Sequence, residues 1–177
     1  MRRCHYFAYG SNMFTPRIGA RIGSARVIGV AALSGHVLRF HKRGRDGSGK
    51  CDAFWTGNGD DLVRGVLFEV TEADMCVLDR HEGRGNGYAR EEVRVEMAGG
   101  ASVTALTYQA TWIDPMRQPY HWYKHHVLAG AREHGLPEAY IGAIAATPSL
   151  ADPVATRQQR EMAIHHRPGL PFTTLPA

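Results

Sequence analysis

Residues 6–13 run Tyr-Phe-Ala-Tyr-Gly-Ser-Asn-Met, and this stretch decides the fold prediction. Residues 6–9 are apolar or aromatic, which is typical of a buried β-strand, and Gly10 lets the backbone turn sharply after it. The N–H groups of Gly10, Ser11 and Asn12 follow in succession, and such a run forms an anion-binding nest when the backbone curls. An ordinary turn at a strand end has the same composition, so both interpretations stay open.

Further strands are expected along the first two-thirds of the chain. They cover residues 25–32, 36–41, 51–56, 63–70, 89–97 and 102–112. The alternation of Val93, Val95 and Met97 with charged residues is typical of a strand with one buried face. Roughly seven short strands joined by tight turns predict a small barrel or a strongly curled sheet.

Helices are expected mainly after the strands. Thr71 and Asp74 resemble a capping box, which predicts a helix that runs through Leu78 and stops near Gly83. Later helices are expected from Pro119 to Gly135, from Pro137 to about residue 147, and after Asp152-Pro153. The Pro-rich residues 168–177 are expected to be extended. Strands first and helices late predict the α+β class.

Composition favours a single soluble domain. The chain has 177 residues, 44% of them hydrophobic and 21% charged, which suits one domain with its own core. No apolar run is long enough to span a membrane, and the N-terminus does not resemble a signal peptide. Cys4, Cys51 and Cys76 cannot all pair, so a cytoplasmic location is expected. The mild, dispersed net charge of +4 argues against a nucleic-acid partner.

Residues 44–51 nearly match a phosphate-binding P-loop. Cys51 stands where the motif needs a hydroxyl, and residues 52–56 read as a strand where the motif needs a helix. A basic hairpin loop is the better interpretation.

The ten histidines invite a metal-binding interpretation. His121 and His125 have the helical spacing of a zinc pair, but no third ligand is evident, and His165-His166 lies in a polar tail. We therefore predict no metal and no cofactor. Ser11 lacks the G-x-S-x-G setting of a nucleophile.

Glu82 is a second candidate for chemistry. It ends the helix that stops at Gly83, where the helix dipole disfavours an ionised carboxylate. Arg80, His81 and Arg84 act in the opposite sense, and the sequence leaves the balance open. A solvated glutamate at a helix end is the competing interpretation.

Together these motifs resemble the γ-glutamylcyclotransferase family over residues 5–148. The similar segments are residues 9–13, 66–70, 78–83, 87–88, 107–108, 123–124 and 130–137, with Tyr140 just beyond. The resemblance implies a small mixed β-barrel with flanking helices and a cavity at one barrel mouth. It implies a family domain over residues 1–150, followed by a polar helix and Pro-rich tail over 151–177 that has no family counterpart.

The resemblance also implies a reaction. A small γ-glutamyl amide is cyclised to 5-oxoproline with release of an amino acid or amine, and Glu82 matches the general acid/base glutamate. The residues expected to bind substrate are Tyr9, Gly10, Ser11, Asn12, Met13, Tyr88, Tyr108 and Tyr123. Core packing is a serious alternative role for the tyrosines.

Other functions stay open at this point. One is a non-catalytic small-molecule binding module with the same fold, and another is an interaction protein that works through its histidine-rich C-terminal helices. The helix and tail after residue 150 could cover the cavity, form a homodimer or do neither. Residues 39–50 match no substrate-selecting element, so the leaving group of the substrate is not defined.

Overall fold

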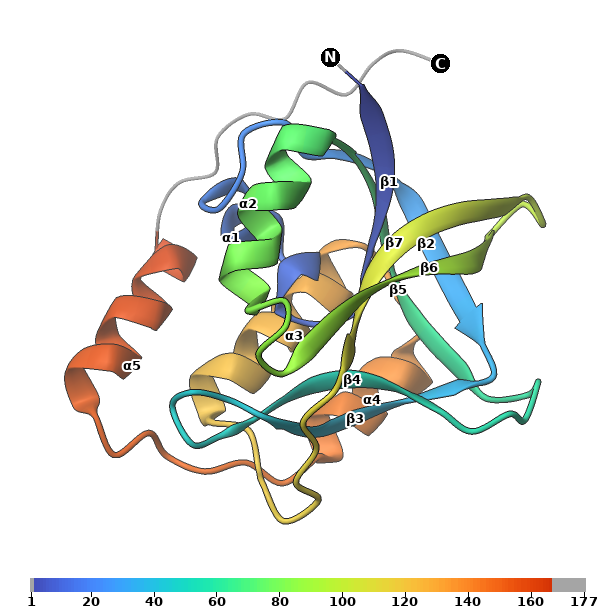
Figure 1. Ribbon diagram of the computed structural model, residues 1–177. Helices are drawn as coiled ribbons and strands as arrows, with labels where there is room; N and C mark the ends of the chain where they lie inside the picture. Colours follow the sequence, from blue (N-terminus) through green and yellow to red (C-terminus); the bar gives the residue numbers. More distant parts are fainter. Residues whose placement is uncertain (1, 167–177) are drawn as a thin grey trace.

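Five strands close into a barrel in the order β1-β5-β2-β6-β7 (Figure 1). They are β1 (Arg3–Ala8), β2 (Arg26–Ser34), β5 (Leu62–Thr71), β6 (Tyr88–Met97) and β7 (Ser102–Ala110). Strand β1 closes the barrel by running parallel to β7, whereas the other pairs are antiparallel. The computed structural model describes residues 2–166, and in them the expected mixed barrel of the α+β class is confirmed.

The remaining two strands form a separate sheet, the hairpin of β3 (His36–Arg43) and β4 (Gly49–Trp55). The barrel therefore holds five strands, fewer than the roughly seven expected. The hairpin is fixed to the barrel through Asp52, whose Oδ1 accepts a hydrogen bond from Ala110 N at 2.8 Å. As expected from residues 52–56, a strand and not a helix follows the P-loop-like segment.

The helices flank the barrel (Figure 1). They are α1 (Thr15–Gly19), α2 (Glu72–Glu82), α3 (His121–Glu133), α4 (Glu138–Ala146) and α5 (Ala155–Met162), with the 3-10 turns η1 (Ser11–Met13) and η2 (Ala163–His166). The two short elements that follow β1, η1 and α1, were not predicted. No helix within residues 2–166 is long and apolar enough to cross a membrane. The tail predicted as extended, 168–177, lies outside the described residues.

Local signals set both ends of α2 as predicted. Thr71 Oγ1 accepts a hydrogen bond from Asp74 N at 3.2 Å, which satisfies one of the free N–H groups of the first turn. Gly83 follows the helix in the left-handed conformation, with φ of 69°, and ends it. These two residues fix Glu82 as the last helical residue.

Close packing holds α3 against the turn that follows β1. Gly130 of α3 has no room for a side chain, because a Cβ there would lie 2.5 Å from Phe14 N and 2.6 Å from Met13 Cβ. The same helix buries Val127 and Ala131 completely, as its predicted apolar face requires. Helix α3 is therefore the support on which η1 rests.

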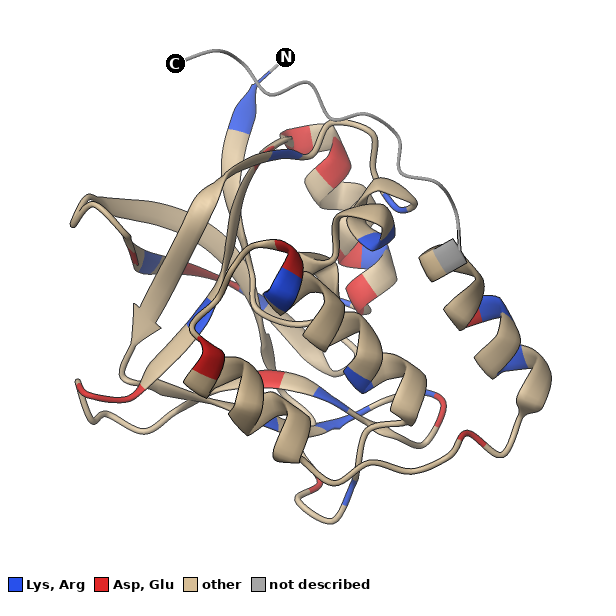
Figure 2. Cartoon of the chain, turned by 180° about the vertical axis from the view of Figure 1, so that it is seen from behind, with Lys and Arg blue, Asp and Glu red and all other residues tan. Residues whose placement is uncertain are grey.

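Charged residues are spread over helices, strands and loops (Figure 2). One charged contact anchors the segment before α5, where Asp152 was expected to cap the helix. The helix begins later, at Ala155, but Asp152 Oδ1 does accept a hydrogen bond from Val154 N at 2.8 Å. Its carboxylate also binds Trp122 Nε1 at 2.7 Å and the guanidinium of Arg157.

Candidate functional site

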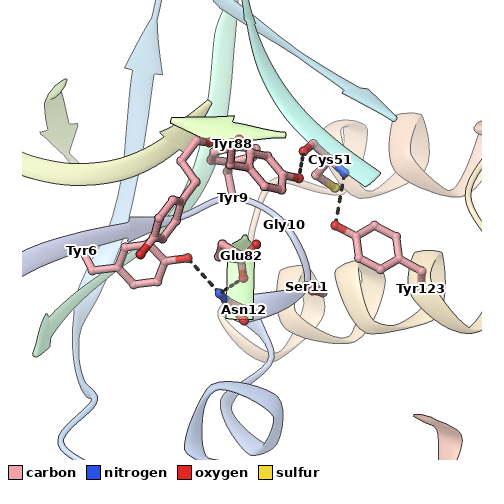
Figure 3. Close-up of a pocket in the computed structure, with 10 residues that line it drawn as sticks. Tyr6, Tyr9, Gly10, Ser11, Asn12, Cys51, Glu82, Tyr88 and Tyr123 are labelled. Atoms are coloured by element: carbon pink, nitrogen blue, oxygen red, sulfur yellow. Dashed lines mark hydrogen bonds between the residues drawn. The ribbon is translucent and has the colours of Figure 1, made fainter. Parts of the chain in front are cut away.

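A pocket opens where the turn after β1 meets the end of α2 and the edge of the hairpin (Figure 3). The residues that line it are Tyr6, Tyr9, Gly10, Ser11, Asn12, Cys51, Glu82, Tyr88, Tyr108 and Tyr123. We call it the inner pocket. It brings together residues from β1, η1, β4, α2, β6, β7 and α3 or from the turns beside them.

The turn after β1 presents backbone donors to this pocket. Met13 N donates to Gly10 O at 3.0 Å and Phe14 N donates to Ser11 O at 3.3 Å, which makes η1. The N–H groups of Ser11 and Asn12 precede the first of these bonds, so they stand at the open amino end of the turn. Such groups can bind a carboxylate or a developing oxyanion.

Gly10 is needed for space and not for a left-handed turn. Its φ is −112°, which other residues can also adopt. A Cβ there would lie 3.0 Å from Cys51 Cβ and 3.4 Å from the hydroxyl of Tyr123. A side chain at this position would push the hairpin and α3 away from the pocket.

Glu82 points its carboxylate into the inner pocket from the end of α2 (Figure 3). Its Oε1 accepts hydrogen bonds from Arg21 Nη1 at 2.6 Å and from Asn12 Nδ2 at 3.0 Å. The side chain is 17% exposed, so it is largely buried but still in contact with the cavity. Both donors bind Oε1, so neither of them occupies the lone pairs of Oε2.

Asn12 holds this carboxylate in place. Its Nδ2 also donates to the hydroxyl of Tyr6 at 2.9 Å, and its Oδ1 accepts from Arg21 Nη1 at 2.7 Å. Each polar atom of the Asn12 side chain thus has a partner, and the amide is held in one orientation. Glu82, Asn12 and Arg21 form a single network at the floor of the pocket.

Tyrosines form the walls. The hydroxyl of Tyr9 donates to Tyr108 O, that of Tyr88 donates to Cys51 O, and that of Tyr123 accepts from Cys51 N. Burial raises the pKa values of Tyr9, Tyr88 and Tyr123 well above the ordinary value. The walls are therefore neutral at physiological pH, with their hydroxyls engaged by the protein.

Two other residues could be proposed as nucleophiles, and their surroundings argue against both. Burial raises the pKa of Cys51 to about 12, so its sulfur remains a thiol and is a poor nucleophile. Ser11 Oγ accepts a hydrogen bond from Arg17 Nε at 3.1 Å, and a guanidinium cannot act as a base. Glu82 is the one carboxylate that lines the inner pocket within the part of the chain described.

Most residues expected at the site do meet there. Glu82 and seven of the eight residues expected to bind substrate line the inner pocket. Met13 does not: its side chain is completely buried and packs against Gly130 of α3, so it supports the turn from below.

Sequence reasoning missed Tyr6, Cys51 and Arg21. Tyr6 begins the apolar stretch 6–9 of the first strand, directly before the turn, and could have been found. Arg21 carries no local signal, because its contact with Glu82 spans 61 residues.

None of the ten histidines, all of which lie within residues 2–166, lines the inner pocket. His121 Nδ1 is 2.8 Å from Ser149 Oγ, and the ring of His125 packs edge-on against His165 with 4.4 Å between centroids. Within residues 2–166, no group of three or more His, Cys, Asp or Glu side chains is placed to hold a metal ion.

Comparison with known proteins finds similar sequences, a matching family and a similar solved structure. The gamma-glutamylcyclotransferases of Bos taurus and Homo sapiens are each 35% identical to the chain over 143 residues, covering 76% of this chain and 73% of the relative. The AIG2-like family matches residues 62–144. A solved structure of a gamma-glutamyl cyclotransferase, 28% identical, superposes with a TM-score of 0.81 over 94% of this chain and 100% of its own.

Proposed function

The chain belongs to the γ-glutamylcyclotransferase family, and from that membership we propose that it cyclises the γ-glutamyl group of a small γ-glutamyl amide. The products are 5-oxoproline and a free amino acid or amine. Glu82 is the general base and then the general acid. The turn at Ser11 and Asn12 and the surrounding tyrosines bind the γ-glutamyl group.

The observation that carries this proposal is a carboxylate among neutral walls. Glu82 is held by Asn12 and Arg21 inside a pocket whose tyrosines and cysteine stay protonated. A pocket of this kind offers one group that can take up a proton and none suited to covalent attack. A reaction in which the substrate supplies its own nucleophile needs no more than this.

The proposed mechanism begins with the substrate α-ammonium group, which gives a proton to Glu82. The free amine then attacks the γ-carbonyl carbon, and a new C–N bond closes a five-membered ring. The negative charge that develops on the carbonyl oxygen is stabilised by the N–H groups of Ser11 and Asn12. The original amide bond breaks as Glu82 returns the proton to the leaving nitrogen. The ring nitrogen gives up its second proton through the same carboxylate, so the leaving group departs as an ammonium and Glu82 ends as a carboxylate. No water is consumed and no electron is transferred.

The shape of the pocket contributes through orientation. The amine and the carbonyl belong to one flexible chain, and the tyrosine walls favour its folded form. Well-oriented intramolecular reactions can lower a barrier by up to about 7–11 kcal/mol. The proton transfer by a positioned carboxylate adds about 10²–10⁴-fold to the rate.

The identity of the product tests this function. The protein is incubated with a panel of γ-glutamyl dipeptides and γ-glutamyl amines, and both 5-oxoproline and free glutamate are measured. We expect 5-oxoproline and no glutamate, and no reaction with the N-acetylated substrates, which lack the attacking amine. Release of glutamate would indicate a hydrolase. Binding without turnover across the panel would indicate a non-catalytic module.

Location is a smaller part of the proposal. Cys4, Cys51 and Cys76 are free thiols, which suits a reducing compartment, and we place the activity in the cytoplasm.

A further inference from the structure

A second cavity of about 220 Å³, which we call the outer chamber, adjoins the inner pocket. The two share Ser11, Glu82, Tyr88 and Tyr123 as lining residues. Because Glu82 lies at the border, the bond that breaks in the proposed reaction also lies there. A γ-glutamyl group in the inner pocket would then place its leaving group in the outer chamber.

The outer chamber is strongly cationic. Five basic side chains line it, from Arg17, Arg21, Lys42, Arg45 and Lys50, against the two carboxylates of Asp46 and Glu82. Positive charge on walls of low dielectric attracts and concentrates anionic ligands.

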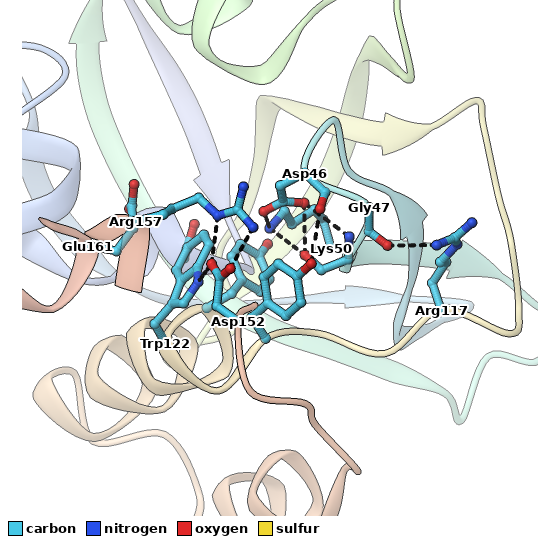
Figure 4. A network of polar contacts seen from close by, with 12 residues as sticks. Asp46, Gly47, Lys50, Arg117, Trp122, Asp152, Arg157 and Glu161 are labelled. Carbon is cyan, nitrogen blue, oxygen red and sulfur yellow. Dashed lines mark hydrogen bonds and ion pairs between the residues drawn. The ribbon is translucent and has the colours of Figure 1, made fainter. Parts of the chain in front are cut away.

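Three of the five cations are already neutralised by the protein. Arg21 Nη1 binds Glu82 at 2.6 Å, Lys50 Nζ binds Asp46 at 2.7 Å (Figure 4), and Arg17 Nη1 binds Glu161 of α5 at 2.9 Å. These pairs use both carboxylates of the chamber. The remaining cations, Lys42 and Arg45, pair with no carboxylate among the described residues.

Lys42 is the more unusual of the two, because it is only 5% exposed. Its ammonium lies 4.5 Å from the centre of the Tyr88 ring, and burial lowers its pKa below the ordinary value. The carboxylates of Glu82 and Asp46 oppose this shift of the Lys42 pKa without forming an ion pair with it among the described residues. A buried charge with no carboxylate in contact is costly, and the aromatic face offsets only part of that cost. A ligand that brings an anionic group to Lys42 would remove the rest of this free-energy cost.

Arg45, in the loop of the hairpin, is exposed and lines the outer chamber. A Cβ built on Gly83 would lie 3.3 Å from its Nη2, so the guanidinium reaches the residue that follows Glu82. Lys42 and Arg45 thus approach the border from the hairpin side, and each offers N–H donors to a carboxylate.

We propose that the outer chamber selects a leaving group with two carboxylates, so that the preferred substrates are γ-glutamyl amides of acidic amino acids. This inference rests on the proposed function. Lys42 and Arg45 are the specificity-determining residues: one neutralises the α-carboxylate of the leaving amino acid and the other its side-chain carboxylate. An amine without a carboxylate leaves both cations unpaired and is the poorest leaving group.

The test compares γ-glutamyl-glutamate with γ-glutamyl-glutamine, which has the same shape and one negative charge fewer. A hydrogen bond to a charged group corresponds to about tenfold or more. We therefore expect kcat/KM for 5-oxoproline release to be about tenfold or more higher for γ-glutamyl-glutamate, and lowest for γ-glutamyl-ethylamide. Of Lys42→Met and Arg45→Gln, the variant that removes the partner of the side-chain carboxylate should bring the glutamate-to-glutamine ratio toward one. The other should lower kcat/KM for both dipeptides alike relative to γ-glutamyl-ethylamide, and both effects should appear mainly in KM.

Arg39→Gln serves as the matched control, because it removes one exposed positive charge from the same hairpin outside the chamber. It should keep the wild-type ratio. Since Arg45 is exposed, its variant also covers the case in which Lys42→Met does not fold.

Failure of the inference and failure of the proposed function give different results. Equal kcat/KM values for the two dipeptides, with 5-oxoproline formed, would overturn the charge selection alone. If no substrate yields 5-oxoproline, the proposed function fails, and calorimetry with the wild type, which then does not consume the dipeptides, still decides the binding preference. Tighter binding of γ-glutamyl-glutamate would support the anion-selective chamber, and equal affinity would overturn it.

Discussion

At the scale of single residues, the site depends on how Asn12 orders its neighbours. Its amide joins Tyr6, Arg21 and Glu82 in one network, so the carboxylate of Glu82 has a fixed position before substrate arrives. Preorganisation of this kind is worth more to a reaction than the strength of any one hydrogen bond.

Removing that amide should impair the reaction more than binding. We expect Asn12→Ala to lower kcat for 5-oxoproline release by about tenfold or more, because it removes a hydrogen bond to the charged Glu82. Tyr6→Phe is the comparison, since the Tyr6 hydroxyl contacts Asn12 and not Glu82. Its kcat should fall less. A larger loss in Tyr6→Phe than in Asn12→Ala would contradict this order of contacts.

Single residues also show which parts of the site could be predicted from the sequence and which could not. The position of Glu82 at the end of its helix was predicted, because a capping residue and a stop glycine fix the two helix ends. The lack of space for a side chain at position 10 could not be predicted, because Cys51 and Tyr123 approach Gly10 from distant parts of the chain. Arg21 was not predicted as a site residue for the same reason, because its contact with Glu82 joins two residues that are far apart in the sequence.

At the scale of elements, the contact of α3 with η1 decides the position of the turn that lines the inner pocket. Gly130 allows the helix to approach until Phe14 N would lie 2.5 Å from any Cβ at that position. The periodicity of α3 predicted that this face is buried, but not that it supports the turn.

Gly130→Ala should destabilise the protein although alanine favours helices. Overpacking costs about 1–3 kcal/mol, against a gain in helix propensity of about 1 kcal/mol. We expect a lower free energy of unfolding in chemical denaturation and a reduced kcat. Gly142→Ala in α4 is the control, because no atom lies within 4 Å of its Cβ position, and it should raise stability by about 1 kcal/mol. Equal stabilisation by both substitutions would refute the close-packing argument.

At the scale of the whole molecule, pairing between strands that are distant in the sequence determines which strands close the barrel, and local sequence patterns do not predict it. The individual strands were predicted because their alternation is local, whereas closure depends on Tyr6 pairing in parallel with Leu106. The hairpin β3–β4 has the same local pattern as the barrel strands yet forms its own sheet. Its place beside the barrel mouth is what creates the outer chamber.

The buried imidazole of His126, in α3, predicts a pH effect on the stability of the whole molecule. His126 is 0% exposed, its Nδ1 lies 2.8 Å from His165 Nε2, and burial lowers its pKa to about 4. An unfolded histidine titrates near 6.5. Below that pH the unfolded chain binds a proton that the folded protein refuses, so stability is present above pH 6.5 and is lost as the pH falls toward 4.

Denaturation at a series of pH values measures this effect. The free energy of unfolding of the wild type should decline by up to about 3 kcal/mol from this group between pH 6.5 and 4. His126→Phe keeps a ring against Phe14 and Trp122 and removes the titrating group. Its slope over the same range should be shallower, whatever its stability at pH 8. Identical slopes would mean that His126 is not held neutral.

The central claim is that the carboxylate of Glu82 moves the proton in an internal cyclisation, and kcat for 5-oxoproline release by Glu82→Gln tests it most directly. The control is Glu72→Gln, which removes an exposed carboxylate from the first residue of the same helix. We predict that kcat falls by about 10²–10⁴-fold in Glu82→Gln and is unchanged in Glu72→Gln. A folded Glu82→Gln variant that retains wild-type kcat would contradict the account.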